Sequence, residues 1–155
     1  MSGEAEAQVV SIKPKGNWPL LLALPEQVLS TEEARRVLPA QYSRADAVIN
    51  IQNSMMLLAA FLQGNHTLLA AALDDRMHQP YRAALCPLLP CLQGLRGNPG
   101  ILGAVLSGAG PSVVIFLDPR SSVQKARKNI AAHLASNRLR AELLLTSITS
   151  RGANR

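Results

Sequence analysis

Apolar and polar positions divide the chain into strand-length and helix-length stretches. Short apolar runs that end at proline, glycine or serine predict buried strands, whereas apolar residues three or four positions apart predict amphipathic helices. The strand pattern occupies residues 9–12, 18–24, 102–106, 112–116 and 138–147. The last of these runs alternates, which predicts four inward-facing residues: Leu139, Ala141, Leu143 and Leu145.

The helical pattern predicts one long helix and several shorter ones. Ser30 and Glu33 form a capping box that begins a short helix, and Pro39 stops it. Ser43 caps the longest helix, which runs to Leu62, closes at Gly64 and turns one apolar face inward: Ala47, Val48, Ile51, Met55, Leu58 and Leu62. Shorter helices are expected over residues 66–76 and 122–136, with a weak helical segment before residue 97. The 122–136 helix is expected to bury one face: Val123, Ala126, Ile130, Ala131 and Leu134.

This order of elements predicts an α+β fold. A strand, several helices, two strands, a helix and a final strand fit a sandwich with helices on one face of a mainly antiparallel sheet. The specific expectation is a ferredoxin-like split βαβ unit enlarged by a helical insertion. Residues 1–16 are expected to be a flexible or short-strand lead-in, and residues 17–152 a single domain.

The composition indicates one folded domain, and the basic residues lie mainly near the end of the chain. Of the 155 residues, 48% are hydrophobic and 17% charged, which excludes disorder for the whole chain. The net charge of +6 comes from the end of the chain, since only Glu142 offsets the basic residues after Pro119. A nucleic-acid-binding module would use this region, but the few aromatic residues are scattered and form no stacking platform. These basic side chains are therefore interpreted as a solvated face, and no nucleic-acid partner is expected.

Cysteine usage and apolar run lengths bear on the compartment. Cys86 and Cys91 have no neighbouring His or Cys, so they are interpreted as free thiols rather than a zinc site, and no metal site is expected. The first residues lack the apolar segment of a signal peptide. No uninterrupted apolar run reaches about 18 residues, so no membrane span is expected. The sequence therefore predicts a cytoplasmic protein.

A glycine-rich loop joins the two apolar runs that predict a hairpin. It consists of Ser107, Gly108, Ala109, Gly110 and Pro111. The glycines permit positive φ and a close backbone approach, and the proline fixes the exit into the second strand. Such a loop can aim consecutive N–H groups and a hydroxyl at a small anion. The alternative is a loop that only turns the chain.

Three segments resemble the homoserine kinases. Residues 30–39, S-T-E-E-A-R-R-V-L-P, are similar to the family's S-T-x-E-A-R-x-x-L-P, and residues 75–82 are similar to its D-R-x-H-Q-P-Y-R. Residues 106–111 resemble the third signature of the wider GHMP small-molecule kinase superfamily. The resemblance covers about residues 17–152, including a Ser-Arg-Gly-Ala sequence at 150–153 that is typical of the family.

The resemblance implies an activity and a set of site residues. Homoserine kinases transfer the γ-phosphoryl group of ATP, with Mg²⁺, to the side-chain hydroxyl of L-homoserine, which leads to O-phospho-L-homoserine in threonine biosynthesis. By resemblance, Arg35 and Arg82 bind the amino acid, Thr31 lies near the acceptor hydroxyl and His78 is a further candidate. A guanidinium suits this role because it can hold a carboxylate with two parallel hydrogen bonds. The glycine-rich loop is implied to support the phosphate-binding loop and the substrate.

Each of these residues also has a structural alternative. Arg82 could pair with Asp74 or Asp75 at the surface, and Arg35 could pair with Glu32 on its own helix. Thr31 could serve only as a first-turn residue, and His78 could pack against Tyr81.

One family element has no counterpart in these 155 residues. The P-x-x-x-G-L-G-S-S-A segment, whose loop and helix N-terminus hold the ATP phosphates, is absent, and no Walker motif replaces it. The resemblance therefore implies a carboxy-terminal domain that is inactive alone, and no catalytic residue is assigned in this chain. Expected partners are L-homoserine, ATP and an amino-terminal kinase half that would dock on an exposed apolar patch, with a homodimer as a further expectation. The alternative is a non-catalytic amino acid-binding or interaction domain.

Overall fold

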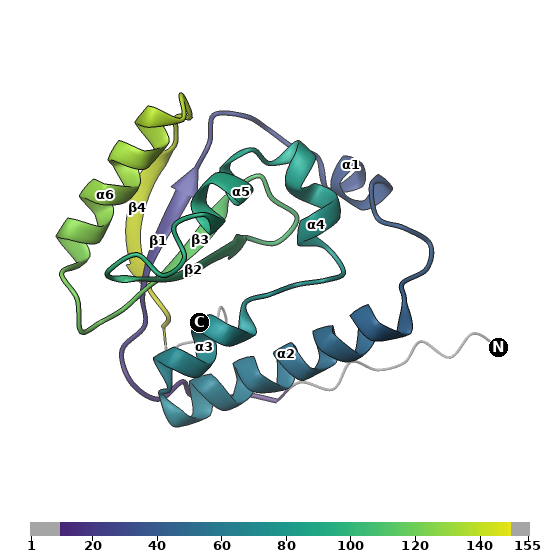
Figure 1. Cartoon of the computed structure of the whole chain (residues 1–155), viewed down its shortest axis with the longest axis horizontal. Coiled ribbons are helices and arrows are strands. Elements are labelled where there is room, and N and C mark those ends of the chain that lie inside the picture. The colour runs from purple at the N-terminus through teal and green to yellow at the C-terminus, as the bar shows by residue number, and fades with distance from the viewer. Residues whose placement is uncertain (1–9, 150–155) are drawn as a thin grey trace.

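A four-stranded antiparallel sheet forms the centre of the protein, whose computed structural model describes residues 10–149 (Figure 1). The strand order is β2-β3-β1-β4. The strands are β1 Pro19–Leu24, β2 Ile101–Leu106, β3 Val113–Leu117 and β4 Glu142–Ser147. The β2–β3 hairpin is local, whereas β1 enters between β3 and β4 and pairs antiparallel with both. The expected α+β class and antiparallel sheet are confirmed.

The helices begin and end largely at the residues whose chemistry predicts it. They are α1 Thr31–Arg36, α2 Arg44–Gln63, α3 His66–Ala72, α4 Gln79–Arg82, the 3-10 turn η1 Ala83–Leu85, α5 Leu88–Gln93 and α6 Val123–Ser136. Ser30, Ser43 and Ser122 each accept a hydrogen bond from the N–H three residues later. Gly64 closes α2 with a φ of 69°.

Helices pack on both faces of the sheet. On one face, Leu21 and Ala23 of β1 belong to a core cluster with residues of α5 and α6. This is the layer of helices that the sequence analysis expected on one face of the sheet. The other face is also covered, because Leu20 and Phe116 pack in a second cluster with residues of α2 and α3. The central strands are apolar at nearly every position, so both of their faces need cover. Figure 1 shows α6 beside the sheet at one side and α2 running below it.

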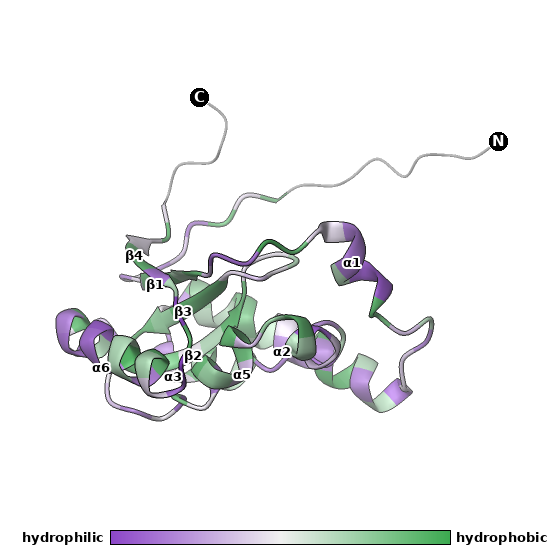
Figure 2. Ribbon diagram, turned by 90° about the horizontal axis from the view of Figure 1, so that it is seen from above, coloured by the Kyte–Doolittle hydropathy of each residue, from purple (hydrophilic) through white to green (hydrophobic). Residues whose placement is uncertain are grey.

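The apolar stripe of α2 that was predicted to face the core faces outward. Val48, Ile51, Met55 and Leu62 have exposed fractions of 47%, 63%, 62% and 51%. A second apolar row on the opposite side of the helix packs against the sheet instead: Ala60 is buried, and Leu57 and Phe61 are partly buried. Phe61 meets Trp18 edge to face with ring centroids 5.0 Å apart, an aromatic contact that helps to hold this row of α2 against the sheet. Figure 2 shows the mixture of hydrophobic and hydrophilic residues along α2.

Two predicted boundaries are wrong: one helix ends earlier than expected, and the last strand begins later. The helix expected over 66–76 ends at Ala72, since Asn50 and Asn53 of α2 hold the following segment through hydrogen bonds to Arg76 N–H and the Asp74 carbonyl. The strand expected from residue 138 begins only at Glu142. There the end of α6 forms a turn in which Arg138 has a φ of 56°.

Smaller differences concern single positions. Leu143 packs on the core as predicted, but Leu145 is 42% exposed on the edge strand β4. Ala131 of α6 is exposed, so the buried face of that helix consists of Ala126, Ile130 and Leu134 at four-residue spacing.

The lead-in of the chain differs in one respect from the expectation. Residues 10–12 form no strand, and Val9 lies outside the described residues. Lys15 is bound to α2 through its N–H to the Phe61 carbonyl, and its own carbonyl accepts from Trp18. The sequence at 150–153 also lies outside the described residues, and the domain limits at 17 and 152 stay predictions.

Candidate functional site

A cavity of about 530 Å³ lies where α1, the segment leading into α4, and the β2–β3 loop meet. Eleven residues line it: Thr31, Arg35, Leu38, Asp75, His78, Gln79, Arg82, Val105, Leu106, Gly108 and Ala109. The fold thus gathers the four candidate substrate-binding residues and two residues of the glycine-rich loop around one space. These come from three segments that are far apart in the sequence.

Arg82 is buried beside this cavity without an anionic partner. Its side chain is 8% exposed, its Nε donates to the Ala34 carbonyl at 2.9 Å, and its Nη1 donates to the Gly108 carbonyl at 3.4 Å. Within residues 10–149 it forms no ion pair, so the alternative of a surface pair with Asp74 or Asp75 is wrong. A buried cation held only by carbonyls is costly to desolvate, which favours an anion arriving in the cavity.

Arg35 reaches the same cavity from α1. Glu32, its alternative partner, instead pairs with Arg36 at 2.9 Å on the exposed side of the helix. The described residues therefore leave the Arg35 guanidinium without a carboxylate. Thr31 begins the helix directly after Ser30, whose side chain accepts from the Glu33 N–H, and this short helix carries both Thr31 and Arg35 to the wall of the cavity.

Asp75 organises the turn that leads into α4. Its carboxylate accepts from the N–H groups of Met77 at 2.8 Å, His78 at 3.0 Å and Gln79 at 2.7 Å. The His78 ring lies 3.5 Å from the same carboxylate and is half exposed. Pro80 fits the first turn of the helix because it needs no N–H partner there. Arg82, the last residue of this short helix, is thus positioned by a chain of backbone contacts.

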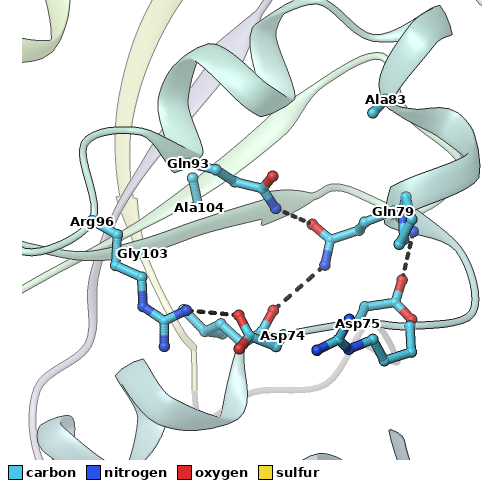
Figure 3. Close-up of a pocket in the computed structure, with 11 residues that line it drawn as sticks. Asp74, Asp75, Gln79, Ala83, Gln93, Arg96, Gly103 and Ala104 are labelled. Atoms are coloured by element: carbon cyan, nitrogen blue, oxygen red, sulfur yellow. Dashed lines mark hydrogen bonds and ion pairs between the residues drawn. The ribbon is translucent and has the colours of Figure 1, made fainter. Parts of the chain in front are cut away.

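Gln79 is a buried polar residue of the site that the sequence analysis quoted within a motif but did not single out. Its Oε1 accepts from the Leu106 N–H at 3.3 Å and from Gln93 Nε2 at 3.2 Å, and its Nε2 donates to the Leu73 carbonyl at 3.5 Å. Figure 3 shows it between α5 and the segment after α3. It therefore joins the edge strand β2, at the entry to the glycine-rich loop, to the helix that carries Arg82.

A second cavity of about 360 Å³ adjoins the first and shares Asp75 and Gln79 with it (Figure 3). Arg96 and Asp74 form an ion pair at 2.6 Å on its wall. Arg96 also donates to the Ala70 carbonyl. These contacts fix α5 to the end of α3, so the wall is a structural brace.

Replacing Gln79 by methionine is expected to lower the free energy of unfolding by about 1–3 kcal/mol. The change removes the buried Gln79 amide and leaves the partly buried Leu106 N–H without its acceptor, and the loss of such a partner costs about this much. Chemical denaturation measures the effect. Gln93→Met is the matched control, because Gln93 is exposed and its loss should change stability by no more than about 0.5 kcal/mol. Equal effects of the two substitutions would contradict this role of Gln79.

Two hydrogen bonds within the glycine-rich loop engage some of its backbone N–H groups. The Ser107 N–H donates to the Ser112 carbonyl at 2.8 Å, and the Gly110 N–H donates to the Ser107 carbonyl at 3.3 Å. Gly108 and Gly110 have φ values of 66° and 95°, as the two glycines predict. Gly108 and Ala109 line the main cavity, whereas Pro111 lines a separate one beside Cys86. Only part of the loop therefore faces the cavity.

Cys86 packs beneath this loop. Burial raises the pKa of its thiol, an effect that the nearby Arg82 guanidinium opposes. A protonated, buried thiol is a poor nucleophile, so Cys86 acts as packing rather than as a reactive group.

Among the described residues, the cavity lacks a set of side chains that could coordinate a metal ion. Residues 10–149 contain no group of three or more His, Cys, Asp or Glu side chains that could hold one. Asp75 is the only carboxylate among the residues lining the cavity, and it is engaged by backbone N–H groups. The described residues therefore fit the binding of an anionic group rather than of Mg²⁺.

Comparisons with known proteins agree on one superfamily. The family described as GHMP kinases C terminal matches residues 57–136, more than half of the chain. A homoserine kinase of Solibacter usitatus is 47% identical over 102 residues, which cover 66% of this chain and 33% of that protein. One of Desulfitobacterium hafniense is 35% identical over 151 residues, which cover 96% of this chain and 50% of that protein. The chain thus spans between a third and a half of these relatives.

Solved structures share the fold. The crystal structure of a homoserine kinase from Cytophaga hutchinsonii superposes with a TM-score of 0.81 at 22% identity, covering 94% of this chain and 46% of that one. A phosphomevalonate kinase of Streptococcus pneumoniae, in complex with phosphomevalonate and AMPPNP, gives a TM-score of 0.67 at 19% identity, covering 91% of this chain and 43% of that one.

Proposed function

We propose, since the chain belongs to the family of GHMP kinase carboxy-terminal domains, that it is the substrate-binding domain of a homoserine kinase. Its ligand would be L-homoserine, which is phosphorylated on its side-chain hydroxyl. ATP and Mg²⁺ would be the cosubstrate and metal of the complete enzyme, and the cytoplasm its compartment. Relatives that are 35–47% identical to the chain carry the name homoserine kinase, which supports the choice of substrate.

The observation that carries this proposal is the convergence of Arg35 and Arg82 on one cavity without a carboxylate partner. The amino acid carboxylate would take the guanidinium groups, which bind such a planar anion in a two-pronged geometry. Thr31 and His78 would then lie beside the rest of the substrate, with Thr31 near the acceptor hydroxyl. The Gly108 carbonyl ties the loop to Arg82, so loop and carboxylate site would move as one unit.

Phosphoryl transfer depends mainly on positioning and on stabilising the charge of the transferred group. The residues described here would do the first of these for the amino acid, by binding and orienting it. The 155 residues carry no phosphate-loop motif, and the cavity does not fit Mg²⁺. ATP and Mg²⁺ would therefore be held by an amino-terminal kinase half, which would bring its phosphate loop to the acceptor hydroxyl.

Isothermal titration of the chain with L-homoserine tests the binding role. Arg35→Met is expected to weaken binding by about tenfold, because one charge-assisted hydrogen bond contributes about 1.5 kcal/mol or more. Arg36→Met is the matched control, since Arg36 is the next residue on the same helix but pairs with Glu32 on the exposed side. Binding that is equally weakened by both substitutions, or no binding at all, would count against the proposal.

A second measurement separates a kinase domain from a non-catalytic binding domain. ADP release from ATP, Mg²⁺ and L-homoserine is measured for the chain alone and after addition of a separately made amino-terminal half of a homoserine kinase. Homoserine-dependent ADP release only in the mixture is expected. Homoserine binding without restored turnover would favour the non-catalytic alternative, for which the missing phosphate-loop motif is the supporting observation.

A further inference from the structure

The second cavity lies along a free edge of the sheet. Within residues 10–149, β2 pairs with β3 on one side and with no strand on the other. Gly103 and Ala104 of this strand line the cavity, whose volume of about 360 Å³ is in the range of small-molecule sites. One wall of the cavity is therefore the backbone edge of β2.

The backbone N–H and C=O groups of Ala104 point into this cavity. In an antiparallel pair, successive residues turn these groups alternately toward the partner strand and away from it. The Ser107 N–H bonds to the Ser112 carbonyl across the hairpin, whereas the Leu106 N–H points away from β3 and reaches Gln79. Ala104, two residues before Leu106, points away as well, and among residues 10–149 its backbone forms no hydrogen bond outside the ladder. Ala104 is only 4% exposed, and a buried peptide group without a partner is costly, so this edge favours a ligand that offers both a donor and an acceptor.

A cation and an anion lie on another wall of the same cavity. Arg96 donates from Nη1 to Asp74 Oδ1 and from Nη2 to the Ala70 carbonyl, and Figure 3 shows the Arg96 and Asp74 side chains pointing toward each other. This pair holds the wall together, but among the described residues the Arg96 Nε and the Asp74 Oδ2 have no hydrogen-bond partner. A carboxylate can therefore bind at Arg96 and an ammonium group at Asp74.

The rest of the cavity is an amide and an apolar surface. Gln93 donates from Nε2 to the Gln79 Oε1, which leaves its own amide oxygen as an acceptor. Leu73, Pro80 and Ala83 supply the apolar surface. An aliphatic side chain fits such a surface better than a charged one, because burying a charge there without a partner is costly.

We propose that this cavity is a binding site for an α-amino acid with a small aliphatic side chain. The ammonium group donates to the Ala104 carbonyl and to Asp74, and the carboxylate accepts from the Ala104 N–H and from Arg96. The two bonds to Ala104 are those that one residue of a neighbouring antiparallel strand exchanges, and a free amino acid has the same spacing between its nitrogen and its carboxyl group. Ala104, Asp74 and Arg96 do not line the cavity beside Arg82, so this inference does not depend on the proposed function.

Nuclear magnetic resonance titration of the chain with L-valine tests the site. The amide resonance of Ala104 is expected to shift and its hydrogen to exchange more slowly with solvent, with a Kd on the order of 1 mM for so small a ligand. The amide of Ala109 reports on the cavity beside Arg82, which it lines. No shift of Ala104 up to about 50 mM L-valine would overturn the proposal, since that is far above the expected Kd. A shift of Ala109 without one of Ala104 would also overturn it.

Three related molecules test which parts of the ligand are recognised. N-acetyl-L-valine lacks the ammonium group, and L-valine methyl ester lacks the carboxylate. Each is expected to bind at least about tenfold more weakly than L-valine, because each loses a charge-assisted hydrogen bond. L-Aspartate is expected to bind more weakly by a similar factor, because its second carboxylate would lie against Leu73. Binding of any of the three as tight as that of L-valine would contradict the proposed ligand class.

Variants of the chain test the position of the site. Ala83→Leu fills the cavity and is expected to abolish L-valine binding, whereas Ala84→Leu is the matched control, because Ala84 is exposed and lines neither cavity. Asp74→Asn keeps an oxygen for Arg96 and should weaken L-valine binding about tenfold. L-Valine binding that is unchanged in Ala83→Leu or in Asp74→Asn would overturn the proposal. Circular dichroism checks the fold, and the shift of Ala109 on adding L-homoserine should be the same in all three variants, which separates this test from that of the proposed function.

Discussion

Replacing Arg82 by methionine is expected to weaken L-homoserine binding on the order of 30- to 1,000-fold, equivalent to about 2–4 kcal/mol. Arg82 is buried beside the cavity and its charge is met only by the carbonyls of Ala34 and Gly108. Among residues 10–149 no carboxylate forms an ion pair with Arg82, so a substrate carboxylate would supply the missing negative charge. Isothermal titration measures the loss. Arg82→Lys should recover little of the affinity, because an ammonium lacks the planar fork.

The same substitution is expected to change the free energy of unfolding by less than about 2 kcal/mol. Two carbonyls lose their donor, which destabilises the fold, but a desolvated cation is also removed, which offsets that loss. Denaturant unfolding of Arg82→Met shows whether weaker homoserine binding comes from the loss of a contact with the ligand or from unfolding of the protein. Arg76→Met is the control, since Arg76 is exposed in the same segment and does not line the cavity beside Arg82. Undiminished homoserine binding by Arg82→Met would show that the carboxylate binds elsewhere.

Replacing Gly110 by alanine is expected to lower the free energy of unfolding by about 2–5 kcal/mol. The residue has a φ of +95°, and an added Cβ would lie 2.8 Å from Cys86 Sγ. Backbone strain of about 1–3 kcal/mol adds to an overpacking cost of about the same size. Denaturant unfolding measures the sum. Gly108→Ala is the matched control in the same loop, because its φ of +66° is similarly positive but nothing lies within 4 Å of the added Cβ.

A double-mutant cycle separates the two contributions at Gly110. Removing the sulfur in Cys86→Ala should relieve the steric part, so Gly110→Ala should cost less in that background. The residual cost is the strain of the positive φ. Additive effects of the two substitutions would mean that the loop moves away from Cys86, and the predicted close approach would then be wrong.

Local chemistry in the sequence was enough to predict most helix ends, and the family resemblance named part of the candidate site. The serine caps and Gly64 act within a few residues, so they predict these helix ends correctly without knowledge of the fold. The S-T-x-E-A-R and D-R-x-H-Q-P-Y-R segments likewise named four residues that line one cavity. Their roles in binding stay predictions until the titrations described above are made.

Other features could not be predicted because they depend on contacts between distant segments. The sequence analysis chose the wrong face of α2, since the helix carries two apolar rows, and the contacts of Ala60 and Phe61 with Trp18 and the sheet come from distant segments. Gln79 escaped notice because its partners, Leu73, Gln93 and Leu106, come from three different segments.

The sequence by itself determined the α+β class, the capped helices and the family to which the chain belongs, because each follows from local pattern or from motifs read in order. Only the tertiary structure decided that Arg82 is buried without an anion and that Arg35 points to the same cavity. It also decided that the apolar stripe of α2 with Val48, Ile51 and Met55 faces outward. Burial and charge pairing are properties of neighbours in space, and the order of residues does not specify them until the chain has packed.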